Sequence, residues 1–446
     1  MNRNNKLLYV AFSALLGLYS CDKAEYINID VPEPIPATLT IDTNTKYQTV
    51  TGFGVMETSW QQTALTDAEV SKLFGKEQGQ LSLNILRVRI APKSSSQNAD
   101  DRWGTIVPVV KKAKSLGAKI LATPWTPPAE LKTNNNIVGG ELVDYEGYAE
   151  YLKEFLGYMQ QNNADIDVLS IQNEPDCEVS YESCFWSGEQ QAYFFENFAE
   201  GIKEAYPSVK LMTGESFQFR HEATDAVLED EEACSNLDIV GGHIYGGGNT
   251  SYDLAKEKGK EVWMTEYLLN EAWDKSSPFE LIGSPRDEAL QFINSVNQSM
   301  LSDMNAYIYW YGRRYYGMLG DGNAGSEMSK ITPRGYLFSL FSKFVTGKTR
   351  IKTILSNQKF DKLKNSAYID NVQNIVLMCI NSGDEEIQDL LLNLPFIPSS
   401  VKKIYYTVPN EAFPNYSEDF DIISELNIDS GINIEPYTVA VFVFER

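Results

Sequence analysis

From residue 50 to residue 345, short apolar runs alternate with longer segments whose apolar residues recur about every 3.6 positions. Runs such as LNILRVRI, AKILATPW and IDVLSIQNEP predict buried strands, and segments such as YEGYAEYLKEFLGYMQQNN predict amphipathic helices. Strands that are apolar on both faces and separated by helices are typical of a parallel sheet covered by helices. About eight such units in roughly 300 residues favour a closed barrel over an open doubly wound sheet.

From about residue 350 the pattern changes to short strands separated by turn residues, as in NIVLMCIN, KKIYYTV and INIEPYTVAVFVFE. This pattern predicts an all-β segment, which we interpret as a small sandwich. The stretch TLTIDTNTKYQ over 38–48 predicts a strand that joins it. We therefore predict an α/β protein with a (β/α)8 TIM barrel over 49–346 and a side-associated C-terminal β-sandwich domain over 347–446.

The N-terminus has the pattern of an export signal. Two basic residues precede an apolar stretch over 7–18, which is too short to span a bilayer and predicts a signal peptide over 1–21. The stretch LYSC resembles a bacterial lipoprotein box, which implies lipidation of Cys21; an ordinary secretory signal with an incidental cysteine is the alternative. Residues 22–37 predict a polar tether. We expect an exported protein, lipid-anchored to the bacterial outer membrane on its outer or periplasmic face.

Composition limits the classes of partner. The formal net charge of −23 argues against nucleic acid, because phosphate binding requires clustered Lys and Arg. No Cys and His spacing suits zinc, so we predict neither a metal nor a cofactor. The 25 Tyr and 7 Trp suit binding of a flat apolar face such as a sugar ring, although part of them belongs to the core. Cys177 and Cys184 could close a small loop by a disulfide. No feature indicates oligomerisation, and we expect a monomer.

Two glutamates occupy unusual positions at strand ends. Glu174 ends the strand VLSIQNEP, and Glu266 ends the strand VWMTEY. Active sites of (β/α)8 barrels lie at the C-terminal ends of the strands. A carboxylate there costs desolvation free energy unless it faces a cleft or a partner, and a structural pairing with Arg87 is the alternative interpretation. Two such carboxyls across a barrel mouth are the pair that glycoside hydrolysis requires, one as acid and base and one as nucleophile.

The motifs around both glutamates resemble those of the retaining (β/α)8 glycosidases. The resemblance narrows to glycoside hydrolase family thirty, and within it to the glucuronoxylan-specific endo-β-1,4-xylanases. It runs from about residue 48 to the C-terminus. In the C-terminal β segment only the pattern of short strands and turn residues matches, and no individual motif does. The segments that carry it, in the order of the family, are TGFGVMETSW, LRVRI, ATPWTPP, SIQNEPD, GESFQF, GGHIYG, VWMTEY, WYGRRYYG and PRGYLFSLFSKFV.

The resemblance implies roles for individual residues. Glu174 would be the acid and base and Glu266 the nucleophile. Other residues would bind the sugar at the cleavage site or hold the nucleophile. Asn173 would bond to the 2-hydroxyl, Trp60 and Trp125 would form apolar walls, His243 and Tyr245 would face the sugar or Glu266, and Arg87 would keep Glu266 ionised.

The stretch WYGRRYYG bears on the substrate. In the xylanase subgroup an arginine of this loop binds the carboxylate of the glucuronic acid branch, with a tyrosine beside it. The resemblance makes Arg313 and Arg314 both candidates, with Tyr315 or Tyr316 as the neighbour. A guanidinium fits a carboxylate in bidentate fashion. The alternative is that both arginines offset nearby carboxylates of the barrel.

Three segments depart from the family pattern. The usual GFGG is GFGVM here, followed by Glu57, which we expect to narrow or charge the cleft. The stretch after Glu266 does not follow the xylanases, and the loop DCEVSYESCFWSGEQ is longer than usual. The resemblance thus implies a retaining endo-acting hydrolase of glucuronic-acid-branched xylan. The alternatives are a family relative that hydrolyses a β-glucosidic or β-galactosidic chain, and a non-catalytic glycan-binding lipoprotein.

Overall fold

The structure is a computed structural model, and it describes residues 37–93, 98–270, 284–356, 360–410 and 419–446. The predicted signal peptide, Cys21 and the tether up to residue 36 lie outside the described residues, as does most of the stretch that follows Glu266. Within the described residues, no helix is both long enough and apolar enough to cross a membrane.

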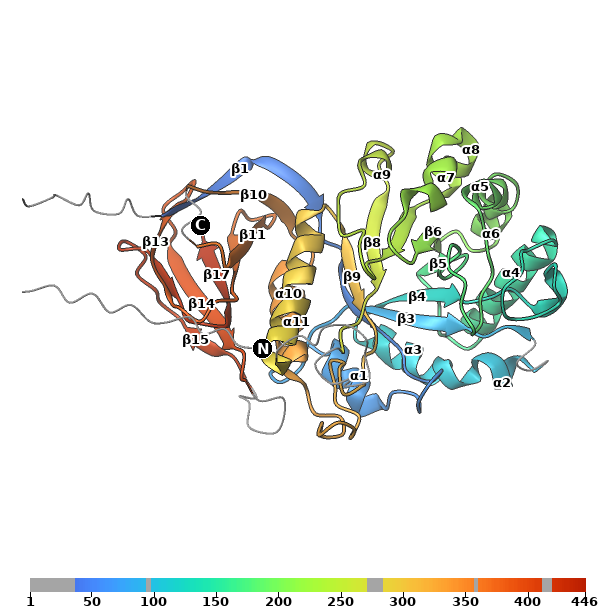
Figure 1. Cartoon of the computed structure of the whole chain (residues 1–446), viewed down its shortest axis with the longest axis horizontal. Helices are drawn as coiled ribbons and strands as arrows, with labels where there is room; N and C mark the ends of the chain where they lie inside the picture. The colour runs from blue at the N-terminus through green and yellow to red at the C-terminus, as the bar shows by residue number, and fades with distance from the viewer. Residues whose placement is uncertain (1–36, 94–97, 271–283, 357–359, 411–418) are drawn as a thin grey trace, which may run out of the picture. The chain divides into compact units, whose positions relative to one another are not determined.

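Eight parallel strands close into a barrel, which confirms the predicted TIM barrel (Figure 1). The first strand pairs with the second on one side and with the last on the other, and this closes the sheet. The barrel strands are β2 (Gly52–Met56), β3 (Ile85–Ile90), β4 (Lys119–Pro124), β5 (Val168–Ser170), β6 (Lys210–Ser216), β7 (Ile239–His243), β8 (Glu261–Glu266) and β9 (Ala306–Tyr309).

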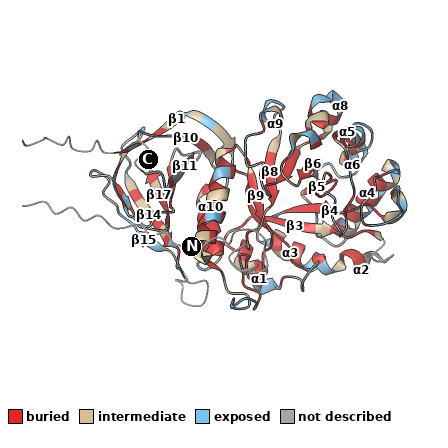
Figure 2. Ribbon diagram, in the orientation of Figure 1, coloured by how far each residue is buried: buried red, intermediate tan, exposed pale blue. Residues whose placement is uncertain are grey.

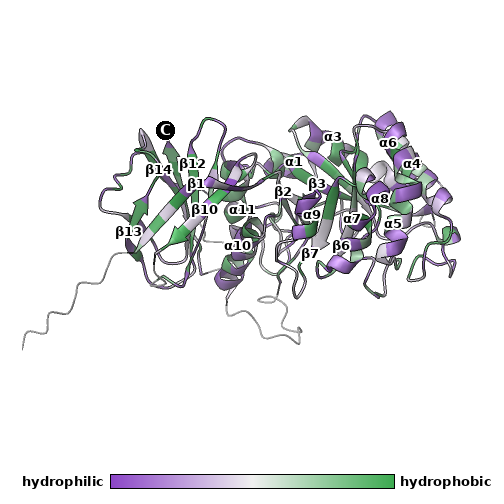
Figure 3. Ribbon diagram, turned by 90° about the horizontal axis from the view of Figure 1, so that it is seen from above, coloured by the Kyte–Doolittle hydropathy of each residue, from purple (hydrophilic) through white to green (hydrophobic). Residues whose placement is uncertain are grey.

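Helices connect the strands and have clear start signals. At α1 (Asp67–Phe74), Thr66 and Glu69 form a reciprocal capping box. At α11 (Pro333–Val345), Thr332 caps the helix and Pro333 takes its first position. Figure 3 shows hydrophilic residues gathering on α5 (Gly188–Asn197), α6 (Ala199–Ala205) and α8 (Glu231–Asn236). The helices are α1 (Asp67–Phe74), α2 (Ala99–Trp103), α3 (Val107–Ser115), α4 (Tyr145–Gln161), α5 (Gly188–Asn197), α6 (Ala199–Ala205), α7 (Asp225–Glu229), α8 (Glu231–Asn236), α9 (Asp253–Glu257), α10 (Pro285–Leu301) and α11 (Pro333–Val345), with 3-10 turns at Gly104–Ile106, Ala129–Leu131 and His221–Ala223.

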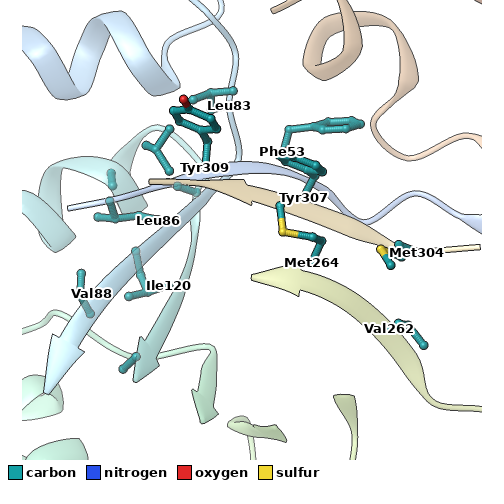
Figure 4. Close-up of a cluster of buried hydrophobic side chains, with 14 of the residues drawn as sticks. Phe53, Leu83, Leu86, Val88, Ile120, Val262, Met264, Met304, Tyr307 and Tyr309 are labelled. Atoms are coloured by element: carbon teal, nitrogen blue, oxygen red, sulfur yellow. The ribbon is translucent and has the colours of Figure 1, made fainter. Parts of the chain in front are cut away.

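Alternation along the barrel strands separates two apolar layers. In β3, Ile85 belongs to a cluster to which seven of the barrel strands contribute, inside the barrel. Leu86 and Val88 belong instead to the large cluster between strands and helices, part of which Figure 4 shows. The barrel strands are buried along nearly their whole length (Figure 2). Because side chains alternate between faces, Arg87 shares the inward face with Ile85.

A nine-stranded, mostly antiparallel sheet forms the second domain, which confirms the predicted β-sandwich class. The N-terminal strand β1 (Thr38–Thr49) pairs antiparallel with β10 (Thr349–Leu355) and parallel with β13 (Ile387–Asn393). The other strands are β10 (Thr349–Leu355), β11 (Leu363–Ile369), β12 (Ile375–Asn381), β13 (Ile387–Asn393), β14 (Ser400–Thr407), β15 (Asp421–Ile423), β16 (Ile432–Ile434) and β17 (Thr438–Glu445).

The curled sheet has apolar residues on both faces. In β12, Leu377 and Cys379 belong to the cluster enclosed by the sheet itself, whereas Val376 and Met378 join the barrel cluster. Helices α10 and α11 contact β11 and β17 on that second face. The sheet is therefore attached to the barrel by a continuous apolar core.

Candidate active site

Charged side chains converge at the C-terminal ends of the barrel strands. Arg87 lies in β3, Glu174 follows β5, and His243 and Glu266 end β7 and β8. Arg87 and His243 are fully buried, and the two glutamates are 5% and 8% exposed. The structure therefore brings the two predicted carboxyls together at one end of the barrel.

Irregular backbone accompanies the three glutamates at this centre. In β8, strict alternation from the inward Trp263 would turn Thr265 inward, but the pairing with β7 shifts so that His243 lies opposite Glu266. In β6, a similar shift coincides with Glu215, whose φ is 42°. Glu174 has a φ of 44°. This left-handed conformation costs a residue with a side chain about 1–2 kcal/mol, and the contacts that follow offset it.

The two predicted catalytic carboxyls face each other. One carboxylate oxygen of Glu174, one of Glu266 and a ring nitrogen of His243 all lie within 4.8 Å of one another. Glu174 Oε1 lies 2.9 Å from His243 Nδ1, and its Oε2 accepts a hydrogen bond from Tyr181 at 3.3 Å. Glu266 Oε1 accepts from Tyr245 at 3.0 Å. Both carboxyls are thus oriented by specific donors.

Arg87 links the nucleophile candidate to its neighbours. Its Nη1 donates to Glu266 Oε2 at 2.5 Å, and its Nη2 donates to Asn173 Oδ1 at 2.6 Å. The same Nη2 lies 3.0 Å from Glu215 Oε1. The guanidinium lies over the ring of Trp125, 4.7 Å from its centroid. One buried cation therefore orients two carboxylates and one amide.

Burial and charge act against each other on the pKa values. Burial alone would raise the pKa of Glu215, but the Arg87 charge and hydrogen bonds outweigh it and hold this pKa at about 2. Burial would lower the pKa of His243, yet the Glu266 and Glu174 carboxylates raise it to about 9. Burial raises the pKa of Glu266, and Glu174 adds to this effect while His243 and Arg87 oppose it.

Three tryptophans form an apolar wall beside the carboxyls. The ring centroids of Trp60 and Trp125 are 5.0 Å apart, and Trp310 lies 6.2 and 5.8 Å from them. Tyr181 packs edge-on against Trp60. Trp310, Tyr181 and Glu215 were not among the residues predicted from the sequence. Each lies in a segment quoted there, and the strand-end position of Glu215 is the signal that could have found it.

The loop that carries Trp60 is held by buried charges. Glu57 is 2% exposed and accepts from the backbone N–H groups of Ser59 at 2.6 Å and Leu65 at 3.2 Å. It therefore orders this loop and does not present its charge to the cleft. Arg89 forms a bidentate ion pair with Glu182 and lies over the Trp60 ring.

The two neighbouring arginines of WYGRRYYG have different surroundings. Arg313 is 4% exposed, and it donates to Glu69 Oε2 at 2.6 Å and to the Thr63 backbone carbonyl at 2.6 Å. These bonds hold its guanidinium against the Trp60 loop and α1. The side chain of Arg314 is 28% exposed and lies beside the buried Tyr316. Of the two candidates, Arg314 has the guanidinium that can reach a ligand.

A metal has little chemical reason to bind here. Among the described residues, Glu174, His243 and Glu266 form the one group with ligand spacing. Arg87 already supplies a cation at 2.5 Å from Glu266, and a pKa of about 9 keeps His243 protonated at neutral pH. The side chains therefore satisfy each other by internal ion pairs. Cys177 and Cys184 are both free thiols in the structure.

A family model matches half of the chain, and curated relatives cover part of it. Residues 92–314 match the family described as Glycosyl hydrolase family 30 TIM-barrel domain. The chain is 31% identical to the glucuronoxylanase XynC of Bacillus subtilis strain 168 over 319 residues, which cover 69% of each chain. It is 27% identical to a putative glucosylceramidase of Caenorhabditis elegans over 48% of this chain and 49% of that one.

Solved structures extend the match to nearly the whole chain. A family 30 subfamily 8 xylanase from Clostridium acetobutylicum superposes with a TM-score of 0.77 at 29% identity, over 92% of this chain and 100% of that one. A family 30 endoxylanase from Clostridium papyrosolvens gives 0.74 at 25% identity, with the same coverage.

Proposed function

The chain belongs to glycoside hydrolase family 30, and from this premise we propose a retaining endo-acting enzyme that cleaves the β-1,4-xylosidic bonds of glucuronic-acid-branched xylan. Membership of the family makes it a glycoside hydrolase. The stereochemistry, the bond and the branch are the proposal. The single observation that carries the mechanism is the spacing of the two carboxyls.

The spacing favours retention of configuration. Retaining glycosidases place their two carboxyls about 5–5.5 Å apart, whereas inverting enzymes need roughly 6.5–9.5 Å to admit a water molecule. Carboxylate oxygens of Glu174 and Glu266 lie within 4.8 Å. This gap leaves no room for a water between the second carboxylate and the sugar, so one carboxylate must attack the sugar directly.

The reaction then has two displacements. In the first, a Glu266 oxygen attacks the anomeric carbon while Glu174 gives its proton to the departing glycosidic oxygen, and a glycosyl ester forms on Glu266. In the second, Glu174 takes a proton from water, and the water oxygen attacks the anomeric carbon and frees Glu266. The Asn173 side chain, held by Arg87 Nη2, is placed to bind the 2-hydroxyl of the sugar.

The charges of the site are compatible with one carboxyl as the acid and the other as the nucleophile. Two cations, Arg87 and His243, face the three carboxyls of Glu174, Glu215 and Glu266. One carboxyl can therefore keep a proton without leaving a cation uncompensated. Burial raises the pKa of Glu266, but its hydrogen bonds from the Arg87 guanidinium and the Tyr245 phenol favour the ionised form that a nucleophile requires. With Glu266 as the nucleophile, Glu174 takes the role of acid and base.

Arg314 is the residue that we assign to the acidic branch. Its side chain is partly exposed next to Tyr316, in the loop after β9. The net charge of −23 repels an acidic glycan at long range, so binding requires a local guanidinium. The relatives named glucuronoxylanase and xylanase support this substrate class. We also propose a lipid anchor at the bacterial outer membrane, because residues 1–21 resemble a lipoprotein signal. A monomer is our expectation for the anchored protein.

Product analysis on two polymers tests the function. The enzyme is incubated with glucuronoxylan and, in parallel, with an unbranched linear xylan. Mass spectrometry gives the masses of the products, and proton NMR identifies the anomer that forms first. We expect acidic oligosaccharides with a β-anomeric reducing end from glucuronoxylan, and little product from the linear chain.

Each other outcome removes one part of the proposal. An α-anomer formed first would exclude the double displacement. Equal cleavage of both polymers would exclude the branch as a recognition element. Cleavage of neither polymer would refute the xylanase assignment, and β-glucosidic and β-galactosidic chains would be the next substrates to assay.

A further inference from the structure

A carboxylate of the protein itself lies beside Arg314, on the same loop after β9. Asp321 is 7% exposed, and its Oδ2 lies 4.0 Å from Arg314 Nε. Both atoms are buried, and neither has a hydrogen-bond partner in the part of the chain that the structure describes. An N–H donor and a carboxylate acceptor that face each other just beyond bonding distance need only a small movement to pair.

The backbone around this pair is fixed. The Arg314 N–H donates to the Leu319 carbonyl at 2.9 Å, and the Gly320 N–H donates to the Lys330 carbonyl at 2.9 Å. The other carboxylate oxygen of Asp321 accepts from the Asn323 N–H at 3.0 Å. The position of Asp321 Oδ2 is thus set by the loop. The long side chain of Arg314 is the part that can move.

We propose that Asp321 is the positioning residue for branch recognition: its Oδ2 accepts from Arg314 Nε when an acidic branch binds. A guanidinium offers a carboxylate two bidentate edges, one that includes Nε and one formed by Nη1 and Nη2. Asp321 occupies the first edge and leaves the Nη1–Nη2 edge for the branch. This inference rests on the proposed function, because it requires an acidic branch on the substrate.

The alternative role for Asp321 is repulsion of the acidic branch, and it predicts the opposite change in KM. A carboxylate near the branch site could simply repel the branch, and its removal would then tighten binding. Under positioning, its removal frees Arg314 to sample other rotamers and weakens binding. The sign of the change in KM therefore separates the two roles.

The experiment compares Asp321→Ala and Asp321→Asn with the wild-type enzyme on two substrates. One is native glucuronoxylan, and the other is the same polymer with its uronic carboxyls chemically reduced to alcohols. We expect KM on native glucuronoxylan to rise about tenfold in both variants, with kcat changed less than twofold. On the reduced polymer, all three enzymes should have the same KM.

The asparagine variant sharpens the test. Its amide oxygen is required by the Asn323 N–H, so its NH2 group faces Arg314 Nε, and two donors cannot bond. Asparagine should therefore be no better than alanine, although it keeps the volume of Asp321 and protects the fold. Thermal unfolding followed by circular dichroism verifies that each variant is folded.

Two controls complete the design. Glu327→Gln removes one negative charge from the same loop at a side chain whose ion pair is with Lys330, and its KM should equal the wild-type value. In an Arg314→Lys background, which lacks Nε, Asp321→Ala should cause no further rise in KM.

The outcomes separate the two proposals. A wild-type enzyme that treats native and reduced polymer alike would overturn the proposed branch recognition, and the role of Asp321 with it. A wild-type enzyme that prefers the native polymer, with Asp321 variants of unchanged or lower KM, would overturn the positioning role alone.

Discussion

Replacing Arg313 by methionine is expected to destabilise the barrel without changing the preference for branched substrate. Arg313 is buried, and its Nη1 lies 2.6 Å from Oε2 of Glu69, which is itself 1% exposed. Its Nη2 also holds the Thr63 carbonyl, in the loop that carries Trp60. Methionine fills most of the same volume but leaves the Glu69 carboxylate without its cation.

The expected loss of unfolding free energy is about 3–5 kcal/mol at pH 7, since removing one partner of a buried pair leaves an uncompensated charge. Burial raises the pKa of Glu69, but in the wild-type protein the bonds from Arg313 and Ser329 outweigh it and keep this pKa lowered. Without Arg313, burial prevails and the pKa rises. Protonation of Glu69 at pH 4 should then recover part of the loss. Urea unfolding followed by fluorescence, at both pH values, measures the difference.

The double variant Arg313→Met with Glu69→Gln is the control, and it should be more stable than Arg313→Met alone at pH 7. Arg314→Met is the matched comparison on the neighbouring residue, and it should change stability by less than about 1 kcal/mol. It should also lose the preference for glucuronoxylan. If Arg313→Met keeps wild-type stability and loses that preference instead, the assignment of the two arginines is reversed and our reasoning fails.

Four further outcomes are expected. Glu266→Gln should abolish turnover and leave glycan affinity measurable by calorimetry; a wild-type rate would exclude Glu266 as the nucleophile. The rate should follow a bell-shaped pH profile because the mechanism needs one ionised and one protonated carboxyl, and a flat profile from weakly acidic to neutral pH would contradict this. The folded-state pKa of His243 is about 9, above its ordinary value of 6.5, so its contribution is complete below pH 6.5 and is lost as pH rises through 9. Unfolding free energy should fall by up to about 3 kcal/mol over that interval, and much less in His243→Gln, as urea titrations would show. Glu57→Ala should lower kcat/KM about tenfold, because the loop that positions Trp60 loses its acceptor; an unchanged value would show that the wall forms without it.

Much of the fold follows from local patterns along the chain. Alternating apolar strands and amphipathic helices predicted the barrel, and the change of pattern near residue 350 predicted the β domain. The segments SIQNEPD and VWMTEY indicated Glu174 and Glu266. A carboxylate at the end of a buried strand costs desolvation free energy unless it faces a cleft or a partner. Such features are local in sequence, so one chain is enough to detect them.

Other features depend on contacts between distant segments and only the tertiary structure decided them. Strict alternation would turn Thr265 inward, and a shift in the pairing of β7 with β8 places Glu266 there instead. Arg313 and Arg314 are equivalent in sequence, yet one binds Glu69, 244 residues earlier, and the other remains partly exposed. Sequence neighbours diverge in this way because a side chain's role depends on what the fold packs against it, and strand register and loop closure are set by the whole barrel.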